Sequence, residues 1–218
     1  MVVDLPDLLE LDINPLLADD KGVLALDARV LVAPDRDARS SLVIRPVPTE
    51  WARTVETVEG RSIFVRPVRP DDADRLVRFY RRLNDEDRLL RFMAATRGPD
   101  PVSIARLTQI DYRRAMNFLA FDKPDGEETI AAAELFADPE HERAEVAIAV
   151  RSDVAGQGIG RAMMRHLIDY AEVEGIACLE GLVRVDNRRM IDFARRSGAR
   201  VEAVPGEDGV MTVSKSLR

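Results

Sequence analysis

Three alternating glycines mark the part of the chain best suited to bind an anion. They lie in the segment VAGQGIGRAMM, residues 154–164, as Gly156, Gly158 and Gly160. An alternating apolar run over 145–150 precedes them and predicts a strand, and 161–171 follows with the pattern of a helix. Glycine lets bare main chain approach a ligand, while the first N–H groups of a helix lack internal partners and carry partial positive charge. The spacing therefore predicts a pyrophosphate site at a helix N-terminus.

The spacing of the glycines also distinguishes this segment from two common phosphate-binding loops. A Walker A loop requires Gly-x4-Gly-Lys-Ser/Thr, and none of these glycines is directly followed by a Lys-Ser/Thr pair. A dinucleotide loop requires Gly-x-Gly-x-x-Gly, whereas the pattern here is Gly-x-Gly-x-Gly. A glycine-rich turn that binds no ligand is the alternative that this segment alone leaves open.

The loop resembles the Gln/Arg-x-x-Gly-x-Gly/Ala segment with which the GNAT family of N-acetyltransferases holds the pyrophosphate of acetyl-CoA. The match begins at Ala155, where the family usually has Gln or Arg. The last helix of the family, Asn-x-x-Ala-x-x-Leu-Tyr-x-x-x-Gly-Phe, is similar to 187–199, with Asn187 and Gly198 in register. Ala194 stands where the family often has a Tyr that serves as general acid.

The predicted elements follow the order of that family. Hydrophobic periodicity and turn residues predict strands over 62–66, 117–121, 129–136, 145–150, 177–183, 200–203 and 210–215. They predict helices over 73–83, 85–92, 161–174 and 187–196, with a further helix beginning at Pro101. The resemblance implies an α/β (α+β) fold with a mixed, mostly antiparallel central sheet, flanking helices and splayed central strands.

The resemblance further implies acetyl-CoA as cosubstrate and a set of contacts to it. The strand residues Ile148, Ala149 and Val150 would pair with the pantetheine arm, and one of their N–H groups would stabilise the oxyanion. The pyrophosphate would lie against the loop and helix start, formed by Ala155, Gly156, Gln157, Gly158, Ile159, Gly160 and Arg161. Asn187 would contact the cosubstrate from the last helix.

Acetyl transfer to an amine also requires a base. A free lysine has a pKa near ~10.4, so almost none of it is neutral at neutral pH. The chain has two histidines, so a carboxylate is the expected base. Glu145 is the first candidate, because lysine acetyltransferases of the family place a catalytic Glu at the matching position, and apolar neighbours would favour its neutral form. Glu134, on the preceding strand, is the second, and the alternative for both is a solvent-facing strand carboxylate.

Two further resemblances concern the N-terminal part and the substrate. Residues 1–32 are similar to the last strands of an ATP-grasp domain of acyl-CoA synthetases, in which the residues matching Asn14 and Asp27 hold Mg²⁺. Because only that final part is present, a remnant without ATP activity is expected. Three segments of the remaining chain resemble Pat-type protein lysine acetyltransferases, which are fused to synthetase-like chains: 65–72, 90–93 and 105–112. The domain prediction is an ATP-grasp remnant over 1–40, a linker over 41–60 and an acetyltransferase domain over 61–218.

Composition argues against several other classes of protein. The net charge of −7 does not favour nucleic-acid binding, and no apolar run is long enough to span a membrane. His141, His166 and Cys178 lack the spacing of metal ligands, so no metal is expected, and the N-terminus lacks a signal-like segment, which favours the cytoplasm.

The sequence thus predicts an acetyl-CoA-dependent acetyltransferase that modifies a protein lysine, with an AMP-forming acyl-CoA synthetase as the partner that the resemblance implies. A small-amine acetyltransferase and a non-catalytic acetyl-CoA sensor remain alternatives, because Ala155 and Ala194 depart from the family pattern.

Overall fold

The computed structural model describes residues 5, 7–33, 45–94, 96 and 98–218. The chain divides into two compact units, residues 1–46 and 47–218.

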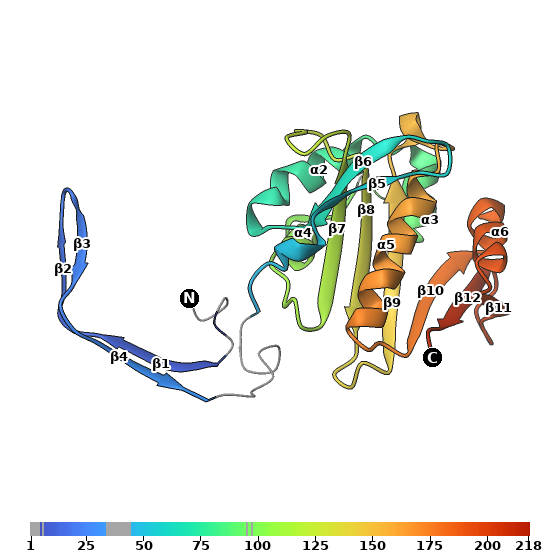
Figure 1. Ribbon diagram of the computed structural model, residues 1–218. Helices are drawn as coiled ribbons and strands as arrows, with labels where there is room; N and C mark the ends of the chain where they lie inside the picture. The colour runs from blue at the N-terminus through green and yellow to red at the C-terminus, as the bar shows by residue number, and fades with distance from the viewer. Residues whose placement is uncertain (1–4, 6, 34–44, 95, 97) are drawn as a thin grey trace. The chain divides into compact units, whose positions relative to one another are not determined.

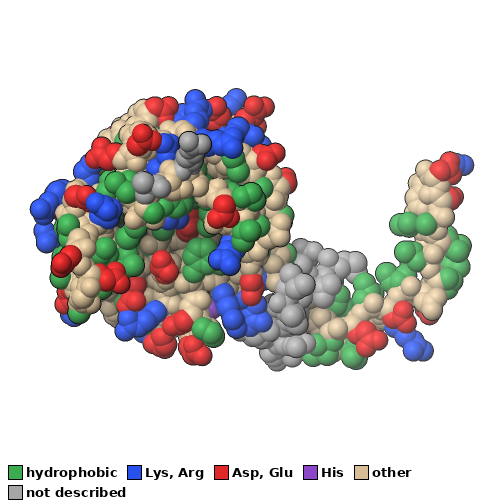
Figure 2. Space-filling view, turned by 180° about the vertical axis from the view of Figure 1, so that it is seen from behind, with side chains coloured by type: hydrophobic (Ala, Val, Ile, Leu, Met, Phe, Trp, Pro, Cys, Tyr) green, Lys and Arg blue, Asp and Glu red, His purple; other side chains and the backbone are tan. Residues whose placement is uncertain are grey.

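The described residues of the N-terminal unit form two antiparallel pairs of short strands. Strand β1 (Leu8–Ile13) pairs with β4 (Ala28–Val32), and β2 (Leu16–Asp19) pairs with β3 (Gly22–Ala25). Most side chains of these strands are exposed, including large apolar ones, which Figure 2 shows as green atoms along the surface of this unit. The Asn14 backbone N–H donates to the Asp27 carbonyl at 3.2 Å, so the two residues that resemble Mg²⁺ ligands are neighbours.

The second unit is built on one eight-stranded sheet in the order β11-β12-β10-β9-β8-β7-β6-β5 (Figure 1). The strands are β5 (Arg53–Glu56), β6 (Ser62–Pro67), β7 (Ala115–Phe121), β8 (Ala131–Ala137), β9 (Arg143–Val150), β10 (Cys178–Arg184), β11 (Arg200–Ala203) and β12 (Val210–Ser216). The helices are α2 (Ala73–Arg81), α3 (Asp85–Phe92), α4 (Pro101–Thr108), α5 (Ile159–Val173) and α6 (Arg188–Arg196), with 3-10 turns η1 (Thr49–Trp51), η2 (Pro70–Asp72) and η3 (Ser152–Val154).

The helices cover both faces of this sheet. Side chains of α5 form one hydrophobic cluster with β7 and β8, and side chains of α2 and α4 form a second cluster. Strand β9 contributes to both clusters, because Val146, Ile148 and Val150 pack on the first and Ala149 on the second. All strand pairs are antiparallel except β9 and β10, which are parallel and are connected through α5. The mixed, mostly antiparallel sheet confirms the predicted fold class.

The expected linker over 41–60 requires a correction. Residues 53–56 form β5, which pairs with β6 from Arg53↔Val65 to Glu56↔Ser62 and extends the sheet by one strand. This segment contains a single large apolar residue, Val55, so its sequence pattern is too short to indicate a strand. The segment is a strand in the structure because it pairs with β6. Residues 41–44 lie outside the described part of the chain.

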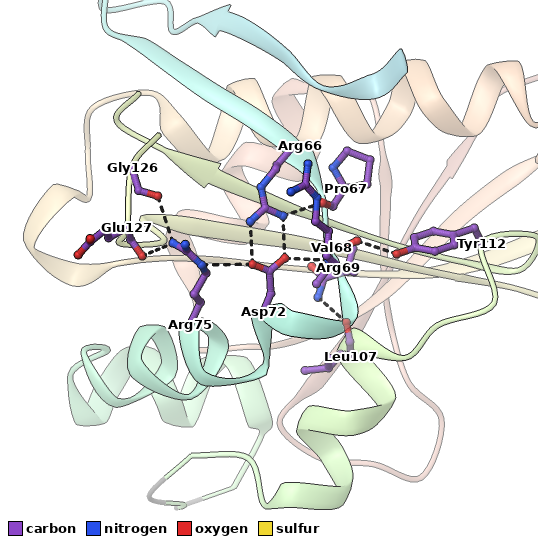
Figure 3. A network of polar contacts seen from close by, with 11 residues as sticks. Arg66, Pro67, Val68, Arg69, Asp72, Arg75, Leu107, Tyr112, Gly126 and Glu127 are labelled. Atoms are coloured by element: carbon purple, nitrogen blue, oxygen red, sulfur yellow. Dashed lines mark hydrogen bonds and ion pairs between the residues drawn. The ribbon is translucent and has the colours of Figure 1, made fainter. Parts of the chain in front are cut away.

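A buried carboxylate connects the end of β6 to the start of α2 (Figure 3). Asp72 accepts two bonds from the guanidinium of Arg66, at 2.6 and 2.7 Å, and one from the backbone N–H of Arg69 at 2.7 Å. Arg75 lies 3.4 Å from the same carboxylate and also donates to the carbonyls of Gly126 and Glu127. The Asp72 side chain is 2% exposed, so these partners replace the water that it would otherwise bind.

Replacing Asp72 by Ala is expected to lower the free energy of unfolding by about 3–5 kcal/mol, because Arg66 would stay buried without its partner. Urea denaturation of the variant measures this loss. The neighbouring Asp71 is exposed, so Asp71→Ala is the matched control, with an expected change within about 0.5 kcal/mol. Equal stabilities of the two variants would contradict the assigned role of Asp72.

His166 of α5 is buried among aromatic rings. Its ring lies 4.4 Å from that of Phe118 and 5.6 Å from that of Trp51, and its Nδ1 accepts a hydrogen bond from Arg53 Nε at 3.0 Å. Burial, and secondly the charge of Arg53, lowers the pKa of His166 to about 4. The folded protein therefore keeps this imidazole neutral at a pH at which the unfolded chain protonates it.

Stability is expected to fall as the pH drops from 6.5 towards 4, because over this range the unfolded chain binds a proton at residue 166 and the folded protein does not. The full difference corresponds to about 3 kcal/mol. Urea denaturation at several pH values measures the fall, which should be reduced in His166→Gln and retained in His141→Asn. An unchanged pH dependence in His166→Gln would refute the assignment.

Candidate active site

The two parallel strands separate after three paired residues. Arg143↔Cys178, Ala144↔Leu179 and Glu145↔Glu180 are the paired positions, although β9 continues to Val150 and β10 to Arg184. A Cβ added at Gly181 would lie 3.0 Å from the Val146 carbonyl oxygen, so the strands are still close immediately beyond the last pair. The splayed central strands that the fold class predicted are thus present, and the Glu145↔Glu180 pair is the point where they begin to diverge.

A cavity of about 440 Å³ lies between the diverging strands. Its lining includes Val146–Val150 of β9, Leu179 and Gly181–Val183 of β10, and Met164 and Ile168 of α5. The lining also includes residues of α3 with its N-cap, Asn84, and residues of α6 together with Lys215 of β12. The cavity therefore contacts helices on both faces of the sheet.

Seven of the residues expected to contact the cosubstrate line this cavity. They are Ile148, Ala149, Val150, Ala155, Gly160, Arg161 and Asn187. The strand residues and the helix start are thereby brought together with Asn187, the N-cap of α6, whose side chain accepts a hydrogen bond from the Met190 N–H at 3.1 Å. Their role in binding stays a prediction.

The other four predicted residues, Gly156, Gln157, Gly158 and Ile159, are not among those that line the cavity. Gly158 is the N-cap of α5 with a φ of 72°, and a Cβ there would lie 1.6 Å from a carboxylate oxygen of Glu59. Gln157 accepts a hydrogen bond from Arg61, and Ile159 is buried in the core. The middle of the loop therefore packs against the turn between β5 and β6, and the left-handed backbone conformation at 158 favours glycine.

Glu134, the second candidate base, is buried and engaged at both carboxylate oxygens. Tyr80 donates its hydroxyl hydrogen to one oxygen at 2.5 Å, and Arg91 forms an ion pair with the other. Burial, and secondly the negative charge of Glu134, raises the pKa of Tyr80 well above its ordinary value, so the phenol stays a donor. Burial lowers the pKa of Arg91, but Glu134 and, secondly, Tyr80 raise it, and the net shift is upward. This arrangement favours a structural role for Glu134, which holds Arg91 in the cavity wall.

Glu145, the first candidate, lies on the same face of the sheet as Glu134. The register pairs Glu134 with Ala147, two residues beyond Glu145, so the two carboxylates are diagonal neighbours on adjacent strands. Glu145 is exposed, contrary to the apolar burial that we expected, because it stands near the start of β9 opposite Phe136, itself 39% exposed. It does not line the cavity but directly precedes Val146, the first lining residue of β9.

Sequence reasoning missed several residues of the cavity wall. Arg91 belongs to the segment 90–93 that was noted for its resemblance, but no pattern indicated that it would pair with Glu134, 43 positions away. Ser197 and Lys215 also line the cavity, and neither belongs to a recognisable motif. These contacts arise from chain segments that only the fold brings together.

Among the described residues, no cluster of three or more His, Cys, Asp or Glu side chains is arranged to hold a metal ion. The same residues include no helix that is both long and apolar enough to cross a membrane. The outer surface that Figure 2 shows carries acidic and basic side chains interspersed.

Comparisons with known proteins agree on one family. The sequence model of the acetyltransferase (GNAT) family matches residues 62–199, and that of the ATP-grasp domain matches residues 1–32. An acetyltransferase of Pseudomonas aeruginosa is 30% identical over 157 residues, which cover 72% of this chain and 83% of that protein. Acetyltransferase Pat of Mycolicibacterium smegmatis is 29% identical over 163 residues, covering 74% of this chain and 46% of Pat, so the chain spans about half the length of that relative.

Solved structures give the same result. The GNAT domain of the PAT protein of Streptomyces lividans superposes with a TM-score of 0.72 at 28% identity, covering 79% of this chain and 100% of that domain. A cAMP-binding acyltransferase from Mycobacterium smegmatis superposes with a TM-score of 0.54 at 26% identity, covering 77% of this chain and 47% of that one.

Proposed function

Because the chain belongs to the GNAT acetyltransferase family, we propose that it transfers the acetyl group of acetyl-CoA to a lysine side chain of a protein. The observation that carries this proposal is the cavity between β9 and β10, with the start of α5 at its wide end and Glu145 beside its narrow end. Similarity to the PAT domain and to Pat supports a protein substrate, and the resemblance to Pat-type enzymes suggests an AMP-forming acyl-CoA synthetase.

The edge of β9 provides the main-chain groups that acetyl-CoA would use. One edge of β9 pairs with β8 along its length, while the other has no strand partner among the described residues after Glu145. Ile148 and Val150 therefore present backbone N–H and C=O groups beside the cavity, whereas the backbone groups of Ala149 face β8. An extended pantetheine arm can pair with them as an additional strand would, and an N–H group there can stabilise the oxyanion formed during transfer.

The start of α5 would hold the pyrophosphate. Its first N–H groups are free of internal partners, and Gly160 and Arg161 lie in the cavity lining. The Arg161 guanidinium adds a full positive charge at this end. Gly156, Gln157, Gly158 and Ile159 would fix the shape of the loop from outside the cavity, so that its backbone is ordered before the ligand arrives.

Glu145 would act as the base. It is exposed on the face that carries α3, next to the point where β9 and β10 diverge, so an acceptor lysine can approach it from solvent. The carboxylate would remove a proton from the lysine ammonium, directly or through water, and the neutral amine would attack the thioester carbonyl. A bound protein would cover Glu145 and supply the apolar surroundings that the free chain lacks.

Glu145→Gln should lower the rate of acetylation of an AMP-forming acetyl-CoA synthetase by about 10²–10⁴-fold, because the amide cannot accept the proton. Mass spectrometry of the synthetase after incubation with acetyl-CoA follows the modified lysines. Affinity for acetyl-CoA, measured by calorimetry, should change little, and the exposed Glu140→Gln serves as the matched control. Full activity of Glu145→Gln would remove this residue from the mechanism. Acetyl-CoA binding without acetylation of the synthetase by the unmodified protein would favour a small-amine substrate or a sensor.

Arg161→Gln should weaken acetyl-CoA binding by about tenfold, as expected for the loss of one charge-assisted contact. Arg165 is the matched control, because it is exposed one helical turn further along α5 and does not line the cavity. Calorimetric titration of both variants tests the assignment, and equal affinities for acetyl-CoA would contradict it.

A further inference from the structure

Lys215 lies at the narrow end of the cavity. The chain has three lysines, Lys21, Lys123 and Lys215, and of these Lys215 alone is among the described residues that line the cavity. In the register of β10 and β12, Lys215 is opposite Leu179, one position before Glu180. Glu180 is the last residue of β10 that pairs with β9, so Lys215 is level with the point where the strands diverge.

The Lys215 ammonium is held at the C-terminal end of α6. Its Nζ donates to the Ser197 carbonyl oxygen at 2.9 Å, and the Ser197 hydroxyl donates to the Ala194 carbonyl oxygen at 2.8 Å. The last carbonyl groups of a helix carry partial negative charge, which stabilises a cation placed beside them. This contact fixes the Lys215 side chain at the end of α6, near Ala194, which also lines the cavity.

The proposed reaction requires a proton at this end of the cavity. Acetyl transfer breaks a C–S bond and leaves a thiolate, and Ala194 occupies the position where the family often has a Tyr that donates the proton. The pyrophosphate would lie at the start of α5, and the acceptor would arrive beside Glu145, so the thioester between them must lie near the narrow end.

Among the polar side chains that line the cavity from α6 and β12, those other than Lys215 are poor proton donors. Asn187, Arg189, Ser197 and Lys215 line the cavity from α6 and β12. Arginine does not release its proton in proteins, and an amide or a hydroxyl group is a much weaker acid than an ammonium. Lys215 is therefore the group on this wall that combines a positive charge with a transferable proton.

We propose that Lys215 stabilises and protonates the leaving thiolate, an inference that rests on the proposed acetyltransferase function. The acceptor nitrogen forms a bond to the acetyl carbon, and the C–S bond breaks with its electron pair remaining on sulfur. Lys215 Nζ gives one proton to the sulfur, which leaves as the thiol, and the neutral amine of Lys215 then takes a proton from water. Glu145 takes one proton from the acceptor ammonium before the attack, and the nitrogen releases a second proton to water as the amide forms.

The test uses Lys215→Met and Lys215→Arg in single-turnover acetylation of the synthetase. Both variants should be slower by about 10²-fold, because neither side chain can transfer a proton to sulfur. Calorimetry should show acetyl-CoA affinity within about threefold of the unmodified protein, since the pyrophosphate contacts are distant from Lys215. Lys123→Met is the matched control, because Lys123 is 68% exposed and lies outside the cavity.

Changing the leaving group of the acetyl donor distinguishes a catalytic role of Lys215 from a structural one. An acetyl selenoester analogue of acetyl-CoA releases a selenolate, which is a much weaker base than a thiolate and needs no proton donor. The deficit of both Lys215 variants should therefore largely disappear with the selenoester, whereas a displaced α6 would impair both donors equally. Arginine retains the charge and a donor for the Ser197 carbonyl, so full activity of Lys215→Arg with acetyl-CoA would overturn proton transfer.

Three further outcomes are informative. Acetylation of Lys215 itself in the unmodified protein, seen as a mass increase on its peptide during turnover, would identify it as a nucleophile and overturn the proposal. If the unmodified protein transfers acetyl groups and Lys215→Met is equally fast, the proposal for Lys215 fails while the proposed function stands. If the unmodified protein binds acetyl-CoA and acetylates neither a protein nor a small amine, both fail together.

Discussion

The divergence of β9 and β10 is the constraint on which the site depends. Within a continuous sheet, each strand would satisfy the backbone groups of its neighbour and leave no space for a ligand. Pairing stops at Glu145↔Glu180, and the opened edge of β9 lies beside the cavity. The parallel direction of the two strands follows from the crossover through α5, which also brings its N-terminus to the wide end of the same opening. One topological feature thus creates the space, the main-chain donors and the positive helix end.

Buried carboxylates fix the helices that form the cavity wall. Asp72 joins β6 to the start of α2 through Arg66 and the N–H of Arg69, and Glu134 joins the middle of β8 to α3 through Arg91. In a poorly solvated interior a carboxylate without such partners would be strongly unfavourable, so these pairs restrict the positions of the helices. The same reasoning explains why Glu134 is poorly suited to act as a base, since Tyr80 and Arg91 already occupy its oxygens.

The N-terminal unit buries far fewer side chains than residues 47–218 do. Its four strands form two separate pairs with most side chains exposed, although they match the ATP-grasp family over residues 1–32. Pairs of strands with so little burial gain little of the hydrophobic free energy that stabilises a domain. Residues 47–218, by contrast, bury extensive hydrophobic clusters of their own.

The sequence by itself determined the order and type of most elements, because these depend on local patterns. Alternation over 145–150 and helical spacing over 161–174 predicted β9 and α5, and seven of the eleven residues expected to contact the cosubstrate line one cavity. What the sequence could not determine depends on contacts between distant segments. The strand over 53–56 needs β6 beside it, Glu134 is paired by Arg91, and Glu145 is exposed because of what surrounds the start of β9. Lys215 gains its place at the narrow end only through the pairing of β12 with β10, because hydrogen-bond partners and solvent exposure are properties of the folded chain and not of the residue.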